Sequence, residues 1–259
     1  MPMSLRRRPF LSAAALACLP GLGRGQGQSR PLRIAYYDNF APFSQLREGR
    51  MGGIFVDIME ELLHRRLGLA LRHEGYPWAR AQQLVRLGEA DAFVTVATPE
   101  RLAYTVAGRE WVTQGRMSMF VRADSPLRQR LQALRSPEDL RGLSLGTYLG
   151  NGWVKARLGG WEVHYSPSRD HALKMLVARR FDVLIDSANA TQAALRAARL
   201  EGEVLELEPA LESSETRLML ARGSPFVGRL EAIDAELRRM KRDGTLARLS
   251  QLPGEGEAP

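Results

Sequence analysis

Strand-like apolar runs alternate with amphipathic helical patterns through much of this chain, and that alternation limits the fold more than any other feature. In the first half the order is strand, helix, strand, helix, strand, over residues 31–37, 53–68, 69–76, 78–88 and 91–97. The first helical pattern repeats apolar residues at three- and four-residue spacing and ends at Gly68, a typical C-terminal position for glycine. This βαβαβ order predicts an α/β domain with a largely parallel sheet.

A second unit of the same kind follows in the chain. Strand patterns alternate with helical patterns over residues 143–150, 151–160, 161–166, 166–180, 181–187 and 189–199. Ser168 is the predicted N-cap of the middle helix. A long amphipathic helix, a turn and a short final helix are expected within residues 224–252. Two α/β units and a helical tail predict two lobes.

Two segments with similar patterns are predicted to connect these lobes. Residues 116–126 (RMSMFVRADSP) and 216–225 (TRLMLARGSP) each combine a strand pattern with a basic residue and a Ser-Pro turn. We expect two parallel connecting strands that act as a hinge. Because ligands of two-lobed proteins usually bind between the lobes, the cleft is the predicted binding site.

The first 25 residues are predicted to be an export signal. Three arginines, Arg6 to Arg8, precede an apolar run from Phe10 to Leu19, and small or helix-breaking residues follow. The stretch RRPFL also resembles a twin-arginine signal, so both export routes stay open. No apolar stretch approaches the ~20 residues of a membrane-spanning helix. The 259 residues, of which 44% are hydrophobic, suffice for one large domain or two modest ones.

Cysteine and charge content exclude several classes of protein. Cys18 is the only cysteine, which excludes an intramolecular disulfide; it is a candidate lipid acceptor, although Ala15 stands where such motifs prefer leucine. Loss of residues 1–25 leaves 33 basic against 29 acidic residues, and the net charge falls from +8 to +4. Such a small surplus gives little support to nucleic-acid binding. The four histidines show no metal-ligand spacing, so neither a metal nor a cofactor is expected.

Several segments together resemble the periplasmic solute-binding proteins of the polar amino-acid type, bacterial extracellular solute-binding family 3. The resemblance rests on IAYYDNFAPFS, GRMGGIFVDIMEELLHRRLG, PWARAQQLVRLGEADAF, TPERLAY, RDHALKMLVARRFDVLIDS and LMLARGSPFVGRLEAIDAELRRMKRDGTLARL. The PWARA form is similar to a divergent branch of the family. The resemblance implies an α/β, two-lobed type II periplasmic-binding-protein fold, with residues 26–118 and 217–259 in lobe 1 and 119–216 in lobe 2. It also implies a periplasmic monomer that delivers a small solute to the membrane permease of an ABC importer.

Within this resemblance, Arg101 is the predicted anchor of the ligand. In the family's amino-acid binders, the arginine of a T-x-x-R turn pairs with the ligand α-carboxylate, and Thr98 and Arg101 occupy these positions. A guanidinium offers a planar fork that matches two carboxylate oxygens. From the residues alone, Arg101 could instead cap the strand end and pair with an acid such as Glu100 or Glu110. Thr95, in the preceding strand, is a further predicted contact.

Three aromatic residues are the predicted walls of the site. The resemblance places Phe40 and Trp78 against the body of the ligand, on opposite sides, where two rings can hold an apolar group or a cation. As an alternative, both rings belong to the core. Tyr37 stands where some basic-amino-acid binders have an acid, which argues against lysine or arginine as the ligand.

The second lobe contributes two predicted contacts. Asn151 follows the loop GTYLG at a strand-to-helix junction, where free backbone N–H groups favour an anion. The resemblance makes Asp186 the acceptor of the ligand's α-ammonium, although it could also be an N-cap. A less polar cradle around Thr95, and Asn151 in place of the family's small hydroxyl residue, weaken the case for an α-amino acid. Arg101 and Asp186 together still indicate a zwitterion or an anion.

Binding rather than catalysis is the predicted function. The sequence contains no serine-nucleophile elbow, and Cys18 precedes the predicted fold. Exported dehydratases that act on cyclohexadienyl acids share this fold, so such an enzyme is an alternative, with Glu74, Glu110 or Asp186 as general acid. A ligand-sensing module for a separate membrane receptor is the other alternative.

Overall fold

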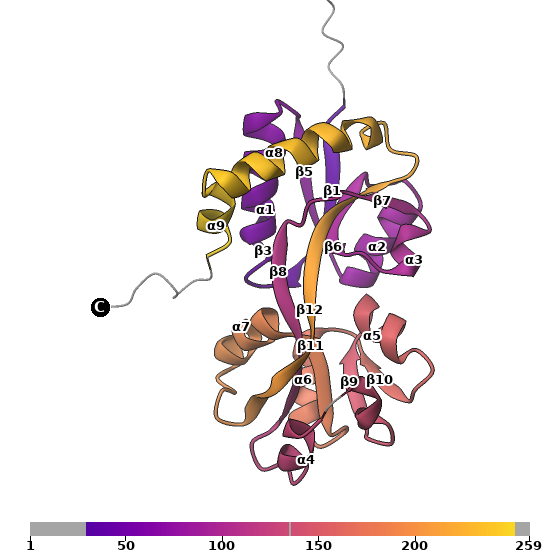
Figure 1. Ribbon diagram of the computed structural model, residues 1–259, viewed down its shortest axis with the longest axis vertical. Helices are drawn as coiled ribbons and strands as arrows, with labels where there is room; N and C mark the ends of the chain where they lie inside the picture. Colours follow the sequence, from indigo (N-terminus) through magenta and orange to yellow (C-terminus); the bar gives the residue numbers. More distant parts are fainter. Residues whose placement is uncertain (1–29, 135, 252–259) are drawn as a thin grey trace, which may run out of the picture.

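Two α/β lobes joined by two long strands make up the computed structural model, which describes residues 30–134 and 136–251 (Figure 1). This confirms the two-lobed α/β architecture that the sequence predicts. The predicted export signal at residues 1–25, with Cys18, lies outside the described residues. Within the part of the chain that is described, no helix is both long and apolar enough to cross a membrane.

The first lobe combines the N-terminal third of the chain with its C-terminal helices. Its strands are β1 (Leu32–Tyr37), β2 (Asn39–Phe40), β3 (Ser44–Arg47), β4 (Arg50–Gly52), β5 (Leu71–Tyr76), β6 (Ala92–Val96) and β7 (Thr105–Ala107). Its helices are α1 (Ile54–Met59), the π-helix Glu60–Arg66, α2 (Trp78–Arg86), α3 (Pro99–Leu102), the 3₁₀ turn Val227–Arg229, α8 (Leu230–Arg242) and α9 (Thr245–Leu249). The predicted helix at 53–68 is therefore α-helical only in its first half. Gly68 follows it with φ +66°, a conformation that favours glycine.

The second lobe is built from the middle of the chain. Its strands are β9 (Leu145–Tyr148), β10 (Val163–Ser166) and β11 (Val183–Ser187). Its helices are α4 (Arg128–Gln132), the 3₁₀ helix Pro137–Leu140, α5 (Gly152–Leu158), α6 (Arg169–Val177) and α7 (Ala188–Ala198). Ser168 caps α6 by accepting a hydrogen bond from the backbone N–H of His171, as predicted.

Two strands, β8 (Thr113–Arg122) and β12 (Val204–Ala221), run between the lobes (Figure 1). They pair with each other in antiparallel register, so the prediction of parallel connecting strands is wrong. The reason is topological: β8 carries the chain out of the first lobe and β12 brings it back, in the opposite direction. The lobe boundaries predicted at residues 118/119 and 216/217 fall inside these strands.

One curled sheet passes through both lobes. Among the described residues it has nine strands in the order β10-β9-β11-β8-β12-β6-β1-β5, with β7 beside β12. Inside each lobe the central pairings are parallel: β1 pairs with β5 and β6, and β9 pairs with β10 and β11. This confirms the parallel pairing predicted for the strands of each α/β unit, whereas β8 and β12 pair with their neighbours in antiparallel register, as do β2, β3 and β4 in a separate small sheet. β1 and β6 are parallel to each other in the first lobe, and β9 and β11 are parallel to each other in the second. In such folds ligands bind beyond the carboxyl ends of parallel strands.

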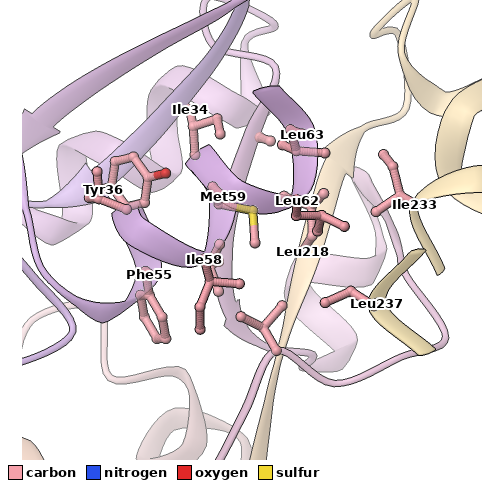
Figure 2. Close-up of a cluster of buried hydrophobic side chains, with 14 of the residues drawn as sticks. Ile34, Tyr36, Phe55, Ile58, Met59, Leu62, Leu63, Leu218, Ile233 and Leu237 are labelled. Atoms are coloured by element: carbon pink, nitrogen blue, oxygen red, sulfur yellow. The ribbon is translucent and has the colours of Figure 1, made fainter. Parts of the chain in front are cut away.

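The core of the first lobe fixes the C-terminal helices onto it. Figure 2 shows side chains of α1 and the following π-helix packed against β12 and α8; they include Ile58, Met59, Leu62, Leu63, Leu218, Ile233 and Leu237. All seven side chains are buried. Burial of each large aliphatic side chain contributes about 1.5–3 kcal/mol. The tail helices are therefore an integral part of the first lobe.

The packing of β9 against Phe181 is tight enough to be tested. A Cβ added at Gly146 would lie 2.3–2.5 Å from ring atoms of Phe181, whereas a Cβ at Gly160 would meet nothing within 4 Å. We expect Gly146→Ala to lower the free energy of unfolding by about 1–3 kcal/mol, because the ring has to shift in a closely packed core. Gly160→Ala, as the control, changes it by less than about 0.5 kcal/mol. Urea denaturation measures both; equal stabilities would contradict this packing.

Candidate functional site

A cavity lies between the two lobes, beside the connecting strands. Its lining combines residues of both lobes and of the strands between them, among them Tyr37, Phe40, Trp78, Thr95, Arg101, Gln114, Tyr148, Asn151, Gly152, Trp153, Asp186 and Ser214. With the lobes in contact it has about 80 Å³ of free volume, room for a few water molecules. A solute must therefore enter while the lobes are apart.

Arg101 reaches this cavity from the end of α3 and is only 3% exposed. Its Nη1 donates to the carbonyl oxygen of Val96 (2.8 Å), its Nε to Oε1 of Gln82 (3.0 Å), and its Nη2 to the carbonyl oxygen of Gly150 (3.0 Å). All three acceptors are neutral. Burial lowers the pKa of the guanidinium, but an arginine stays protonated in any case. The site therefore contains a buried positive charge that no carboxylate neutralises among the described residues.

The acids considered for Arg101 have other partners. Glu100 pairs with Arg86 and Lys155, each at 2.9 Å. Glu110 pairs with Arg238 and Lys241 of α8. The alternative in which Arg101 pairs with Glu100 or Glu110 is therefore wrong, whereas its other part is confirmed, because Arg101 caps the end of β6 at the carbonyl oxygen of Val96.

The loop after β9 approaches Arg101 and α2 closely because it contains two glycines. The carbonyl oxygen of Gly150 accepts hydrogen bonds from Nε1 of Trp78 (2.8 Å), Nε2 of Gln82 (3.4 Å) and Arg101. Gly150 has φ +90°, and a Cβ there would lie 2.6 Å from Cδ1 of Trp78. A Cβ at Gly152 would lie 2.7 Å from Cζ of Arg101. Contact between the lobes at this point thus requires glycine at both positions.

Aromatic rings form one side of the cavity. Tyr37 lies between Phe40 (ring centroids 6.0 Å apart) and Trp78 (6.4 Å), and Tyr148 of the second lobe stacks on it at 5.8 Å. That Phe40 and Trp78 lie on opposite sides of the ligand stays a prediction; in the structure both rings stack on Tyr37. The hydroxyl of Tyr37 is buried and has no hydrogen-bond partner among the described residues. Burial raises its pKa, so the phenol stays protonated and can donate.

Asp186 forms a buried ion pair with Arg169, the first residue of α6. Nε of Arg169 lies 2.5 Å from Oδ2 of Asp186, and Nη2 lies 3.2 Å from Oδ1. The backbone N–H of Ser187 also donates to Oδ1 (2.6 Å), and the Thr191 hydroxyl donates to Oδ2 (3.1 Å). A carboxylate offers about four acceptor positions, and four donors fill them here.

The Arg169 side chain extends from the second lobe to the aromatic residues of the first. Its Cζ lies 4.7 Å from the ring centroid of Phe40, 5.0 Å from that of Tyr148 and 6.0 Å from that of Tyr37. Burial alone would lower its pKa, but the charge and hydrogen bonds of Asp186 raise it above the usual value. The arrangement is a cation enclosed by aromatic rings, a favourable contact when water is excluded.

Two predicted contacts have structural partners. The Thr98 hydroxyl caps α3 by accepting from the backbone N–H of Arg101, and Thr98 is not part of the cavity lining. Asn151 lines the cavity, but its Oδ1 caps α5 and its Nδ2 donates to Oγ1 of Thr147 (2.8 Å) and to the Ile185 carbonyl oxygen (3.3 Å). Thr95 also lines the cavity and lies at the end of β6.

Sequence reasoning missed Arg169, Gln82 and Tyr148. One signal could have identified Arg169: it begins a helix, where the positive end of the helix dipole disfavours a cation. Such a cation needs a compensating anion nearby. Gln82 and Tyr148 have no comparable signal, because an amide on a helix and a tyrosine at a strand end are common in any fold.

No metal site is found in the described residues, where no cluster of histidine, cysteine and acidic side chains has the required grouping. Of the three candidate general acids, Glu74 contacts Arg33, Arg72 and the Tyr76 hydroxyl. Glu110 and Asp186 are paired as described above. Among the described residues, the cavity thus presents to a ligand a guanidinium, aromatic faces, the Tyr37 phenol, and neutral polar side chains such as Thr95, Gln114 and Ser214.

The comparisons with known proteins agree with this architecture. The sequence model of the bacterial extracellular solute-binding proteins, family 3, matches residues 32–252. No curated protein matches the sequence.

Solved structures similar to this chain have the same fold at low sequence identity. A histidine kinase sensor domain with similarity to periplasmic binding proteins has a TM-score of 0.73 and 16% identity, over 86% of this chain and 96% of that one. The arginine-, lysine-, histidine-binding protein ArtJ from Geobacillus stearothermophilus has a TM-score of 0.71 and 15% identity, over 89% and 97%. The ancestral amino-acid-binding protein AncCDT-1, a precursor of cyclohexadienyl dehydratase, has a TM-score of 0.66 and 19% identity, over 85% and 93%. Identities this low establish the fold alone.

The buried pair of Asp186 and Arg169 can be compared with an exposed pair. We expect Asp186→Asn to lower the free energy of unfolding by about 3 kcal/mol, because it leaves a buried guanidinium without its counter-charge. Glu208, which pairs with Arg116 at the surface, is the matched control, and Glu208→Gln changes stability little because water screens that pair. Chemical denaturation measures both variants. Equal losses in the free energy of unfolding would contradict a larger contribution of the buried pair to stability.

Proposed function

The chain belongs to the bacterial extracellular solute-binding proteins of family 3, and from this premise we propose that it captures a small carboxylate-bearing solute between its lobes. The observation that carries the proposal is Arg101, a buried guanidinium at the cavity whose acceptors are all neutral. A buried charge without a counter-charge is unfavourable, so a site built around one favours an anion. A carboxylate is the anion that best fits the planar fork.

Other side chains complete the proposed site. Thr95 lies beside Arg101 in the lining, and Trp78, Tyr37 and Phe40 offer apolar faces to the body of the solute. Among the predicted contacts, Thr98 and Asn151 act on the ligand indirectly, because they hold the start of α3 and of α5 in place. The assignment of these roles is part of the proposal.

Closure of the lobes over the solute is the proposed mechanism. The Gly150 carbonyl, the pair of Glu100 with Lys155, and the hydrogen bond from Asn39 to Asp170 all join one lobe to the other. The two strands β8 and β12 connect the lobes, so bending them would open the cavity without unfolding either core. A solute that contacts both lobes shifts this equilibrium toward the closed form.

The closed form is the one we propose a membrane permease of an ABC importer recognises. The family is extracellular, and the predicted signal at residues 1–25 supports a periplasmic location for a monomeric binding protein. Delivery to a permease, the export route and the monomeric state are parts of this proposal.

The structural neighbours name two other uses of this fold. One is a sensor domain of a histidine kinase, and one is an ancestral binding protein that is a precursor of a dehydratase. A dehydratase would need a general acid at the cavity, yet the three carboxyl groups considered are each held by at least one cation. Incubation of the protein with any bound acid, followed by product analysis, separates turnover from binding.

A thermal-shift screen is the direct test of the proposed function. We expect one class of carboxylates, among a panel of amino acids, organic acids, amines and sugars, to raise the melting temperature. At about 100 times its dissociation constant a ligand adds about 2.7 kcal/mol to the stability of the folded state. Stabilisation by amines or sugars alone would contradict the proposal.

Removal of the anchor tests the role of Arg101. We expect Arg101→Ala to weaken binding of the best carboxylate at least about thirtyfold, because the anion loses its only buried counter-charge. Arg86→Ala is the matched control: Arg86 is an exposed arginine nearby, paired with Glu100, and its loss leaves affinity nearly unchanged. Calorimetric titration gives both dissociation constants, and circular dichroism checks that the variants are folded. Unchanged affinity in a folded Arg101→Ala protein would refute the anchor.

A further inference from the structure

The solute class can be narrowed further, on the assumption that the proposed function holds. We propose that the protein binds carboxylates that lack an α-ammonium group, such as 2-oxo, 2-hydroxy or aryl acids, and that Arg169 occupies the place where a ligand cation would bind. Arg169 is thereby the residue that determines specificity against amino acids.

The first argument is the saturation of Asp186. This carboxylate is 1% exposed, and its oxygens already accept from Arg169 twice, from the Ser187 backbone and from the Thr191 hydroxyl. An ammonium group needs free acceptors, and Asp186 has none left. Arg101 is the other charged side chain in the cavity lining, among the described residues, and it is itself a cation. A ligand ammonium would therefore find no free carboxylate in the lining, among the described residues, and would have only neutral acceptors such as Gln114 and Ser214, which is a weaker arrangement than an ion pair.

The second argument is the place of Arg169 among the rings. Phe40, Tyr37 and Tyr148 lie around its guanidinium at 4.7 to 6.0 Å. Aromatic faces of this kind bind cations, and here the cation is supplied by the chain itself. A second positive group beside it would meet repulsion instead of attraction.

The third argument is the balance of charge and hydrogen bonding. Arg101 and Asp186 line the cavity, and Arg169, which is not part of the lining, neutralises Asp186, so the positive charge of Arg101 is left for the ligand to neutralise. A monocarboxylate neutralises it, whereas a zwitterion does not. The unpartnered hydroxyl of Tyr37, held protonated in the cavity wall, offers a hydrogen bond to an oxygen such as that of a 2-oxo group.

The rings also indicate what the body of the acid is like. Tyr37, Phe40, Trp78 and Tyr148 line the cavity with apolar faces, and Phe43, Phe55 and Met117 extend this lining. Such a lining favours an aromatic or branched aliphatic body over a polar one.

Matched pairs of acids test the inference on the unmodified protein. Calorimetric titration with phenylpyruvate, phenyllactate and phenylalanine, and then with 4-methyl-2-oxopentanoate and leucine, compares compounds that differ at the α-carbon alone. We expect the oxo or hydroxy acid of at least one set to bind about tenfold more tightly, or better, than its amino acid, because the unpaired ammonium is penalised.

The outcomes separate this inference from the proposed function. If the amino acids bind as tightly as their oxo acids or more tightly, and Arg101→Ala abolishes that binding, the inference is overturned and the proposed function stands. If no carboxylate of these sets or of the wider thermal-shift panel binds, both are overturned.

A variant tests the assignment to Arg169 directly. In Arg169→Ala the carboxylate of Asp186 regains free acceptors and the space among the rings opens. We expect the affinity ratio of amino acid to oxo acid to rise at least about tenfold above that of the unmodified protein. Arg179→Ala, which removes an exposed arginine at the other end of α6, is the control and leaves the ratio unchanged. An unchanged ratio in folded Arg169→Ala would overturn the role of Arg169; if that variant does not fold, the matched pairs still decide the solute class.

Discussion

The guanidinium groups of Arg101 and Arg169 are buried between the lobes. Their contacts determine how closely the lobes approach and what charge the cavity has. A buried charge is tolerated when it has acceptors, and the two arginines meet this condition differently. Arg169 has the carboxylate of Asp186, whereas Arg101 has three neutral oxygens, one of them the carbonyl of Gly150 in the opposite lobe. That contact depends in turn on glycine at positions 150 and 152, since any side chain there would displace Trp78 or Arg101. Arg101 thus contributes both to the close approach of the lobes, through its hydrogen bond to Gly150, and to the positive charge of the cavity.

The way in which the two lobes are joined also determines how they can move apart. Each lobe has its own hydrophobic core, and the continuous sheet is carried from one to the other by β8 and β12. Contacts between the lobes away from these strands include polar ones, such as the pair of Glu100 with Lys155, and the stacking of Tyr148 on Tyr37. Polar groups exchange readily for water when the lobes part, and a bound anion that contacts both lobes favours the closed state.

Much of the fold was predictable from the sequence, and the site was predictable only in part. The alternation of strand and helix patterns predicted both lobes, because apolar periodicity is a local signal. It could not give the direction of the connecting strands, which follows from the path of the whole chain. Of the eight ligand contacts that the resemblance predicted, seven line the cavity in the structure, and Thr98 caps α3 instead. Arg169 escaped prediction because its partner, Asp186, is 17 residues away and meets it only through the fold.

A crystal structure with the carboxylate that most raises the melting temperature would test the central claim most directly. The account predicts both carboxylate oxygens within hydrogen-bonding distance of the Arg101 guanidinium, in the closed cleft between the lobes. It predicts as well that Asp186 stays paired with Arg169, with the ligand's body against Tyr37 and Trp78. A carboxylate bound away from Arg101, or an ammonium group seated on Asp186 in place of Arg169, would contradict it.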